Sequence, residues 1–171
     1  RFLASEHWGV EPDMVLLAKA LSGGHVPIGA VATKGWIFAK VFDRLDRAVV
    51  HGSTFSKNDL AMAAGLATLS VIEEERLVER AATMGAAILA DLTAIGARSE
   101  FVRSVRGKGM MIGIEFGPPR SLRLKAAWQL LAAINSSLFC QMVTLPLFRR
   151  HRILCQVAGH DSLVVKLIPS L

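Results

Sequence analysis

The segment Leu16-Leu17-Ala18-Lys19-Ala20-Leu21-Ser22-Gly23-Gly24 decides how the fold and the chemistry of this chain are interpreted. It sets Lys19 at the end of an apolar run and directly before a pair of glycines, and Pro27-Ile28-Gly29-Ala30 follows. We expect this pattern to form a short strand that runs into a tight turn. Apolar surroundings disfavour the charged form of an amine, and the neutral form can add to a carbonyl as a Schiff base. The segment therefore predicts a reactive lysine in a dry, enclosed place.

The size and composition of the chain favour a compact fold. Its 171 residues are 52% hydrophobic, which is enough apolar material for one good core. The chain begins within a sequence pattern and carries no secretory signal segment, so we interpret it as a fragment of a longer protein. The two cysteines, Cys140 and Cys155, lie in apolar surroundings without metal-ligand spacing. They predict free thiols in a reducing cytoplasm, with a disulfide as the alternative, and no metal site.

The formal net charge of +6 makes nucleic acid a partner to consider. The excess basic residues, however, are spread over predicted turns and helix ends, and no aromatic residues alternate with them. General surface charge is therefore the favoured interpretation, and we predict no nucleic-acid partner.

One apolar segment needs comparison with a membrane span. Residues 126–148 carry no charged side chain and are long enough to cross a bilayer as a helix. Helical spacing instead places one apolar stripe opposite a polar face, and the stripe consists of Leu131, Ile134, Leu138, Met142 and Leu145. This pattern predicts an amphipathic helix of a soluble domain that ends near Pro146, and no membrane partner.

The chain as a whole alternates between strands and helices. The predicted strands cover residues 14–18, 28–33, 102–105, 110–116, 153–157 and 163–168. A long helix is predicted from Asn58 to Ala94, and another from Leu124 to about Met142. The order of these elements predicts an α/β fold that ends in a small α+β domain.

A pair of hydroxyl side chains lies just before the long helix. In His51-Gly52-Ser53-Thr54-Phe55, the adjacent side chains of Ser53 and Thr54 are suited to hold a phosphate group. The same residue types also cap helices, and on local grounds the cap is the commoner role. The residues by themselves leave both roles open.

Two later segments complete the set of motifs. Val105-Arg106-Gly107-Lys108-Gly109-Met110 forms a glycine turn into a strand, and Val164-Val165-Lys166-Leu167-Ile168-Pro169 is a strand that ends at a proline. Together with the lysine segment and the hydroxyl pair, in this order, they resemble the class III, or ornithine-type, pyridoxal-phosphate aminotransferases of fold type I. The resemblance is firm over residues 2–116 and thinner over residues 117–159.

The resemblance implies the C-terminal part of a fold type I transferase. Residues 1–60 would be the end of the large α/β cofactor domain, residues 61–95 a connecting helix, and residues 96–171 a small α+β domain. The residues that bind the cofactor ring would lie upstream of this chain. The sequence departs from the family at Asp59, where a proline is usual, and at Lys166, where many members have an arginine that binds a substrate carboxylate.

The resemblance also implies roles for individual residues. Lys19 would hold pyridoxal 5'-phosphate as a Schiff base, Thr54 beside Ser53 would contact the phosphate of the partner subunit's cofactor, and Lys166 would bind substrate. The expected protein is a cytoplasmic homodimer with its active site at the interface, and it moves an amino group from a small-molecule amino donor to an aldehyde or keto acceptor. The alternatives are an aminomutase or epimerase of the same fold, and a truncated, non-catalytic interaction module.

Overall fold

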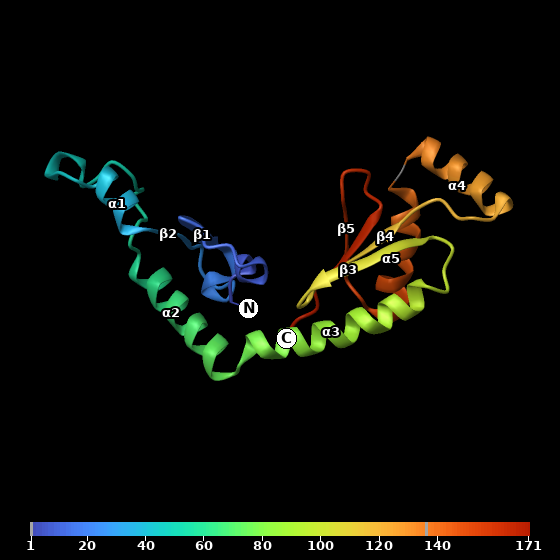
Figure 1. Cartoon of the computed structure of the whole chain (residues 1–171), viewed down its shortest axis with the longest axis horizontal. Helices are drawn as coiled ribbons and strands as arrows, with labels where there is room; N and C mark the ends of the chain where they lie inside the picture. The colour runs from blue at the N-terminus through green and yellow to red at the C-terminus, as the bar shows by residue number, and fades with distance from the viewer. Residues whose placement is uncertain (1, 136) are drawn as a thin grey trace. The chain divides into compact units, whose positions relative to one another are not determined.

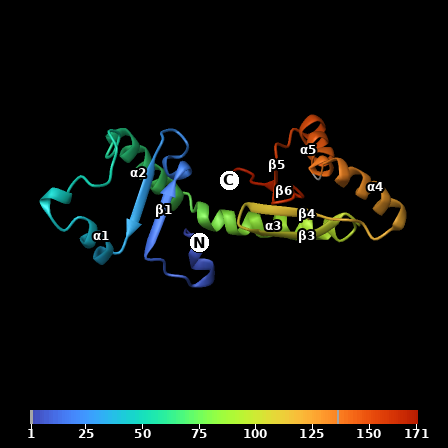
Figure 2. The same cartoon turned by 90° about the horizontal axis from the view of Figure 1, so that it is seen from above.

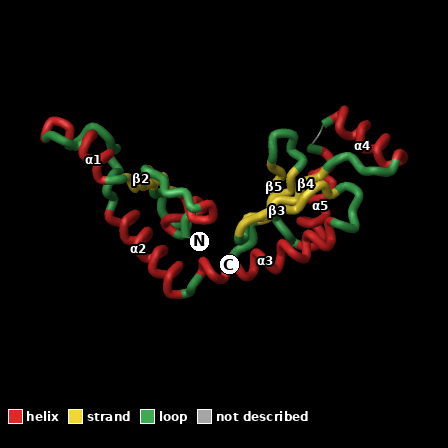
Figure 3. The backbone as a smooth tube through the Cα atoms, in the orientation of Figure 1, coloured by secondary structure: helices red, strands yellow, loops and turns green. Residues whose placement is uncertain are grey.

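The computed structural model describes residues 2–135 and 137–171. The chain divides into two compact units, Arg1–Val78 and Glu79–Leu171. The α-helices and strands of both units are labelled in Figures 1 and 2, and Figure 3 separates helices from strands by colour. Helices and strands alternate along the chain, which agrees with the predicted α/β class.

The first unit contains one strand pair and several helices. Its elements are the 3-10 turns η1 (Ala4–Trp8), η2 (Lys19–Ser22) and η3 (Leu45–Arg47), the strands β1 (Met14–Ala18) and β2 (Gly29–Thr33), and the helices α1 (Gly35–Val41) and α2 (Asp59–Glu74). β1 and β2 pair antiparallel, with Leu16 opposite Val31. These two side chains are 79% and 50% exposed, so one face of the strand pair is apolar and open.

The long helix predicted from Asn58 is interrupted. α2 ends at its C-cap Glu75, and Arg76 adopts a φ of +52° before α3 (Leu77–Gly96) begins. Acidic side chains are unfavourable at the negative end of a helix. The run Glu73-Glu74-Glu75 lies at this end, and the last turn of α2 has no basic residue to balance it. The acidic run therefore gives a physical reason for the break.

The second unit is an antiparallel sheet with helices, as expected for an α+β domain. Its strands are β3 (Val102–Lys108), β4 (Met111–Phe116), β5 (Gln156–Ala158) and β6 (Val164–Leu167), and its helices are α3 from Glu79 onward, α4 (Leu122–Ile134) and α5 (Leu138–His151). The strand order is β3-β4-β6-β5, and every neighbouring pair is antiparallel. Strands are confirmed in all four predicted places, although β5 begins at Gln156 and not at Ile153.

The core of the second unit joins the sheet to α4 and α5. Phe116, Trp128, Cys140 and Val165 are buried there, and the half-buried Phe139 packs against them. The ring centroid of Phe139 lies 4.7 Å from that of Trp128 and 5.2 Å from that of Phe116. This aromatic cluster fixes both helices against β4 and β6.

The single amphipathic helix predicted over residues 124–142 is wrong, because the segment forms two helices. The side-chain oxygen of Asn135 accepts hydrogen bonds from the backbone N–H and the hydroxyl of Ser137, at 2.8 and 2.7 Å. Such local side-chain bonds compete with helix continuation. Pro146 lies inside α5 rather than at its end.

The break also changes which side chains form the core. Of the predicted apolar stripe, Ile134, Met142 and Leu145 are 69%, 59% and 50% exposed. No single helix among the described residues is long and apolar enough to cross a membrane, whereas α4 and α5 meet those criteria as a pair bent by 96°.

Both cysteines are free, as predicted. Cys140 is buried and Cys155 is half-buried, and burial raises the pKa of each thiol. The neutral thiol form is therefore favoured at both positions, which suits a role in packing. The alternative of a disulfide between them is not realised.

A side-chain network ties β3 to β4 at the surface. The carboxylate of Glu115 accepts hydrogen bonds from Arg106 and from the hydroxyl of Ser104, the latter at 2.9 Å. These bonds, the one from Arg106 first, lower the pKa of Glu115. The carboxylate therefore stays ionised to a lower pH than in an unfolded chain.

Close packing of α3 on the β3–β4 turn requires a glycine. Gly85 is buried in α3, and a methyl group added there would overlap the backbone carbonyl oxygen of Gly109. Gly109 itself has a φ of +54°, so the turn cannot easily move its backbone. The contact thus leaves no room for any other side chain.

We predict that Gly85→Ala destabilises the second unit by about 1 to 3 kcal/mol, the usual effect of overpacking. Thermal unfolding followed by circular dichroism would show a lower melting temperature. Gly35→Ala is the control, since Gly35 opens α1 and has no atom within 4 Å of the added methyl position. Equal melting temperatures for the two variants would contradict the assigned contact.

Candidate active site

Lys19 occupies a strained position where β1 ends. Ala18 is fully extended, with φ −161° and ψ −171°, and Lys19 then adopts a φ of +56° as the first residue of η2. A left-handed backbone at a residue with a side chain costs roughly 1 to 2 kcal/mol. Such strain persists only where the surroundings hold it, and it clusters at functional sites. Among the described residues, four others outside glycine share this conformation, namely Lys57, Arg76, Arg152 and Ser162, so Lys19 is distinguished by combining it with a place in the lining of a pocket.

Ser22 closes the loop that follows Lys19. Its side chain is only 1% exposed, and its hydroxyl donates to the carbonyl oxygen of Val26 at 2.5 Å and accepts from the N–H of Val26 at 3.3 Å. Between these residues, Gly23 and Gly24 take φ values of +65° and +83°, which glycine adopts without strain. The sequence pattern did not single out Ser22 as a site residue, although a small hydroxyl residue directly before two glycines was a visible signal.

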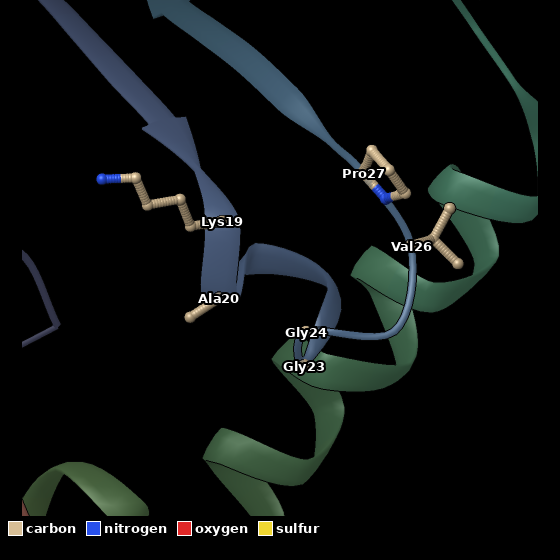
Figure 4. Close-up of a pocket in the computed structure, with 6 residues that line it drawn as sticks. All are labelled: Lys19, Ala20, Gly23, Gly24, Val26 and Pro27. Atoms are coloured by element: carbon tan, nitrogen blue, oxygen red, sulfur yellow. The ribbon is translucent and has the colours of Figure 1, made fainter.

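Helix α2 supports this loop. Gly65 of α2 is buried, and a methyl group added there would lie 3.1 Å from Cδ1 of Ile28. A methyl group added at Gly23 would lie 3.2 Å from the hydroxyl oxygen of Thr68, which is also on α2. In Figure 4, the side chain of Lys19 extends from the end of the strand away from the glycine loop. The helix thus holds the loop while the amine stays free.

Lys19 and the loop that follows it line a pocket of about 450 Å³. It is lined by Lys19, Ala20, Gly23, Gly24, Val26 and Pro27 (Figure 4). The amine makes no ion pair within the part of the chain that the structure describes. Lys19 is exposed, so the dry enclosure expected from the sequence is not provided by this chain alone. What the chain provides is an exposed lysine that lines the edge of a pocket, with its amine directed away from the glycine loop (Figure 4).

Ser53 and Thr54 do not cap α2. The cap is Asn58, whose side-chain oxygen accepts from the N–H of Ala61 at 3.1 Å, so the cap alternative for the hydroxyl pair is wrong. Ser53 and Thr54 lie in an exposed turn, and their hydroxyls make no hydrogen bond among the described residues. Neither residue lines the pocket of Lys19. The pair therefore remains available to a ligand outside this pocket.

The segment that carries the hydroxyl pair borders a second pocket, of about 560 Å³. This pocket is lined by Phe38, Phe42, Asp43, Arg44, Leu45, Ala48, His51 and Lys57. Several apolar side chains in this part of the chain are almost fully exposed to solvent: Leu45 is 95%, Val49 90% and Phe55 80% exposed. Such apolar exposure in one stretch of chain is typical of a surface that another polypeptide covers.

Lys166 lies in β6 of the second unit. Its backbone is opposite Gly113 of β4 and Gln156 of β5, which places it in the interior of the sheet. The residue is half-buried and makes no ion pair with any described residue. A single unpaired ammonium group is thus fixed on a central strand.

Comparison with known proteins identifies the family. The model of the class-III aminotransferase family matches residues 1–170. Diaminobutyrate--2-oxoglutarate aminotransferase of Rhizobium meliloti is 43% identical over 121 residues, which are 71% of this chain and 24% of that protein. Curated relatives of this kind are much longer than this chain, which spans only between 24% and 32% of their lengths.

Solved structures agree with the sequence match. An ornithine delta-aminotransferase of Plasmodium falciparum has a TM-score of 0.76 and 32% identity, over 99% of this chain and 37% of that one. An ornithine aminotransferase of Toxoplasma gondii, with PLP at partial occupancy in its active site, has a TM-score of 0.75 and 27% identity, over 99% and 34% of the two chains. The chain belongs to the class III aminotransferase family.

Proposed function

We propose that this chain is the lysine-bearing part of a pyridoxal-phosphate-dependent aminotransferase. The observation that carries the proposal is Lys19, which lines a pocket, has a left-handed backbone and carries an exposed amine without an ion pair among the described residues. Family membership and the cofactor of the related Toxoplasma gondii protein support it. The substrates would be a small-molecule amino donor and an aldehyde or keto acceptor.

The residues of the chain fit the cofactor. A pocket of about 450 Å³ lies within the usual range for small ligands, and a primary amine is the group that binds an aldehyde. The free hydroxyls of Ser53 and Thr54, next to backbone N–H groups, suit a phosphate. When bound, pyridoxal phosphate supplies a reactive aldehyde and a ring that takes up the electron pair released at the substrate carbon.

Lys19 would have two successive tasks. Its Nζ would first hold the cofactor through its aldehyde group and would be released when the amino group of the donor takes its place. Once released, Nζ would be the group of this chain placed to take a proton from the donor carbon that carries the nitrogen and to give it up again, as general base and then general acid. Both tasks need a mobile amine at a fixed Cα, and the loop closed by Ser22 provides the fixed Cα.

Thr54 would act in a homodimer. It lies in the exposed segment beside Leu45, Val49 and Phe55, whose apolar side chains are uncovered in one chain. A second subunit would cover these side chains, and the hydroxyl of Thr54 would then reach the phosphate held by that subunit. We also place the protein in a reducing compartment such as the cytoplasm, because both of its thiols are free.

The first prediction from this proposed function concerns the cofactor lysine. Borohydride reduction of the complete protein, followed by peptide mapping, should place the cofactor on Lys19, and Lys19→Ala should abolish the covalent adduct and the transfer activity. Lys34→Ala is the matched control, because Lys34 already pairs with Asp13 at 2.9 Å and should not carry the cofactor. A cofactor found on Lys34, Lys40 or Lys108 would contradict the assignment.

The second prediction concerns the phosphate. Thr54→Ala should weaken cofactor binding by about 1 to 3 kcal/mol, the range for a lost charge-assisted hydrogen bond. Thr54→Ser keeps the hydroxyl and should retain nearly all of the affinity. Both affinities can be measured by titrating the cofactor-free protein and following absorbance. Unchanged affinity in Thr54→Ala, or an active monomer, would refute the dimer contact.

The third prediction concerns acceptor choice. Arginine binds a carboxylate through two parallel hydrogen bonds, whereas the ammonium of Lys166 is a point charge on a flexible stem. We therefore expect at least one substrate whose reacting end lacks an α-carboxylate, and Lys166→Arg should shift preference towards α-keto acids. Turnover of a simple aldehyde and of an α-keto acid should be compared in both proteins. A wild-type preference for α-keto acids in both half-reactions would overturn this expectation.

A further inference from the structure

The charge of this chain is concentrated in one segment of the second unit. Residues 117–160 contain six of the 20 basic residues and none of the 14 acidic ones. The formal charge of this segment therefore equals the +6 of the whole chain, and the remaining residues are balanced. The segment comprises α4, α5 and the stretches that flank them. Its basic residues are Arg120, Arg123, Lys125, Arg149, Arg150 and Arg152.

Helix α4 presents an apolar face to solvent within this unit. Trp128 is buried in the core, and Leu131, one turn further along, is half-buried on the same side. The opposite side carries Leu122, Leu130 and Ile134, which are 84%, 68% and 69% exposed. The exposed face of a helix in a soluble protein is normally polar. Here it is apolar, with Arg123 and Lys125 in its first turn.

Helix α5 repeats the arrangement. Met142, Leu145 and Phe148 follow one another at helical spacing and are 59%, 50% and 52% exposed. Arg149 and Arg150 lie in the last turn, and no acidic residue lies in the first turn. Both helices, which follow one another in the chain with a bend of 96° between them (Figures 1 and 2), therefore combine exposed apolar side chains with basic ones.

We propose that α4 and α5 form a docking surface for an anionic lipid bilayer, so that the enzyme works at a membrane surface. Helices that lie in a membrane interface bury apolar side chains among the acyl chains and place basic ones at the headgroups. An anionic leaflet attracts such basic residues. Residues 117–160 contain no carboxylate side chain that the leaflet would repel. A second copy of this surface would bring like charges together, and nucleic acid offers nothing that would cover the apolar face.

The proposal concerns contact with the surface and not a span. The two helices are anchored to the sheet by Trp128, Phe139 and Cys140, and crossing the bilayer would require them to leave this core. The sequence-based expectation of no membrane partner rested on a single helix with one buried apolar stripe. That helix is not formed, and much of its stripe is exposed.

Vesicle flotation of the complete, cofactor-loaded protein tests the proposal. The protein should float with vesicles of phosphatidylcholine and phosphatidylglycerol but not with phosphatidylcholine alone, and high salt should weaken the binding. Arg149→Gln with Arg150→Gln should weaken partitioning roughly thirtyfold, which corresponds to ~1 kcal/mol for each basic residue. Leu130→Gln with Ile134→Gln should weaken it by a similar factor.

Matched control variants carry the same types of substitution, apolar residue to Gln and Arg to Gln, outside residues 117–160. Ile95→Gln alters an apolar residue of α3 that is 62% exposed, and Arg80→Gln with Arg98→Gln removes two exposed basic residues. All variants should keep the wild-type melting temperature, and the controls should float like the wild type. Absence of flotation with anionic vesicles, or equal losses in the controls, would overturn the proposal. A shift in oligomeric state in Leu130→Gln with Ile134→Gln, with flotation unchanged, would show that a protein covers this face.

Discussion

The candidate site depends on a short loop that keeps Lys19 in a left-handed backbone conformation. The hydroxyl of Ser22 binds both backbone groups of Val26, and the paired glycines between them take the dihedral angles that this closure needs. Gly65 lets Ile28 approach the surface of α2 closely. The cost of the Lys19 backbone, roughly 1 to 2 kcal/mol, is thus offset by a buried hydrogen-bonded loop packed on a helix. Without that support, the Cα atom from which the Lys19 side chain extends would not be held in one position.

Apolar runs and glycines in the sequence predicted the strands and turns whose formation is decided by residues adjacent in the chain. The strand from Met14 to Ala18, the sheet strands of the second unit and the turn after Lys19 could all be read from apolar runs and glycines. The breaks in both predicted long helices could not, because each depends on a specific side-chain effect. One is the acidic end of α2, and the other is the hydrogen bond from Ser137 to Asn135. Apolar periodicity is insensitive to such effects.

The roles of the site residues are harder to predict, because they depend on what surrounds each residue. The sequence placed Lys19 correctly before its turn but implied an enclosed amine, whereas the residues of this chain form only one wall around it. Ser53 and Thr54 were ambiguous until Asn58 proved to be the cap of α2. Ser22 escaped notice because a buried serine that closes a loop has no periodic signature. Residues that fix the backbone around a site are therefore harder to recognise from the sequence than residues that react with a ligand.

The break between α4 and α5 also decides the character of the surface of the second unit. In one continuous helix, Leu131, Ile134, Leu138 and Met142 would share a face, and that face would have to be buried against the sheet. The side chain of Asn135 ends the first helix, so the core takes Trp128 from α4 and Cys140 from α5. Ile134 and Met142 then turn to solvent, in a segment where every charged side chain is basic. A single polar side chain thus separates the buried part of an apolar segment from its exposed part, and the arginines around the exposed part favour an anionic partner.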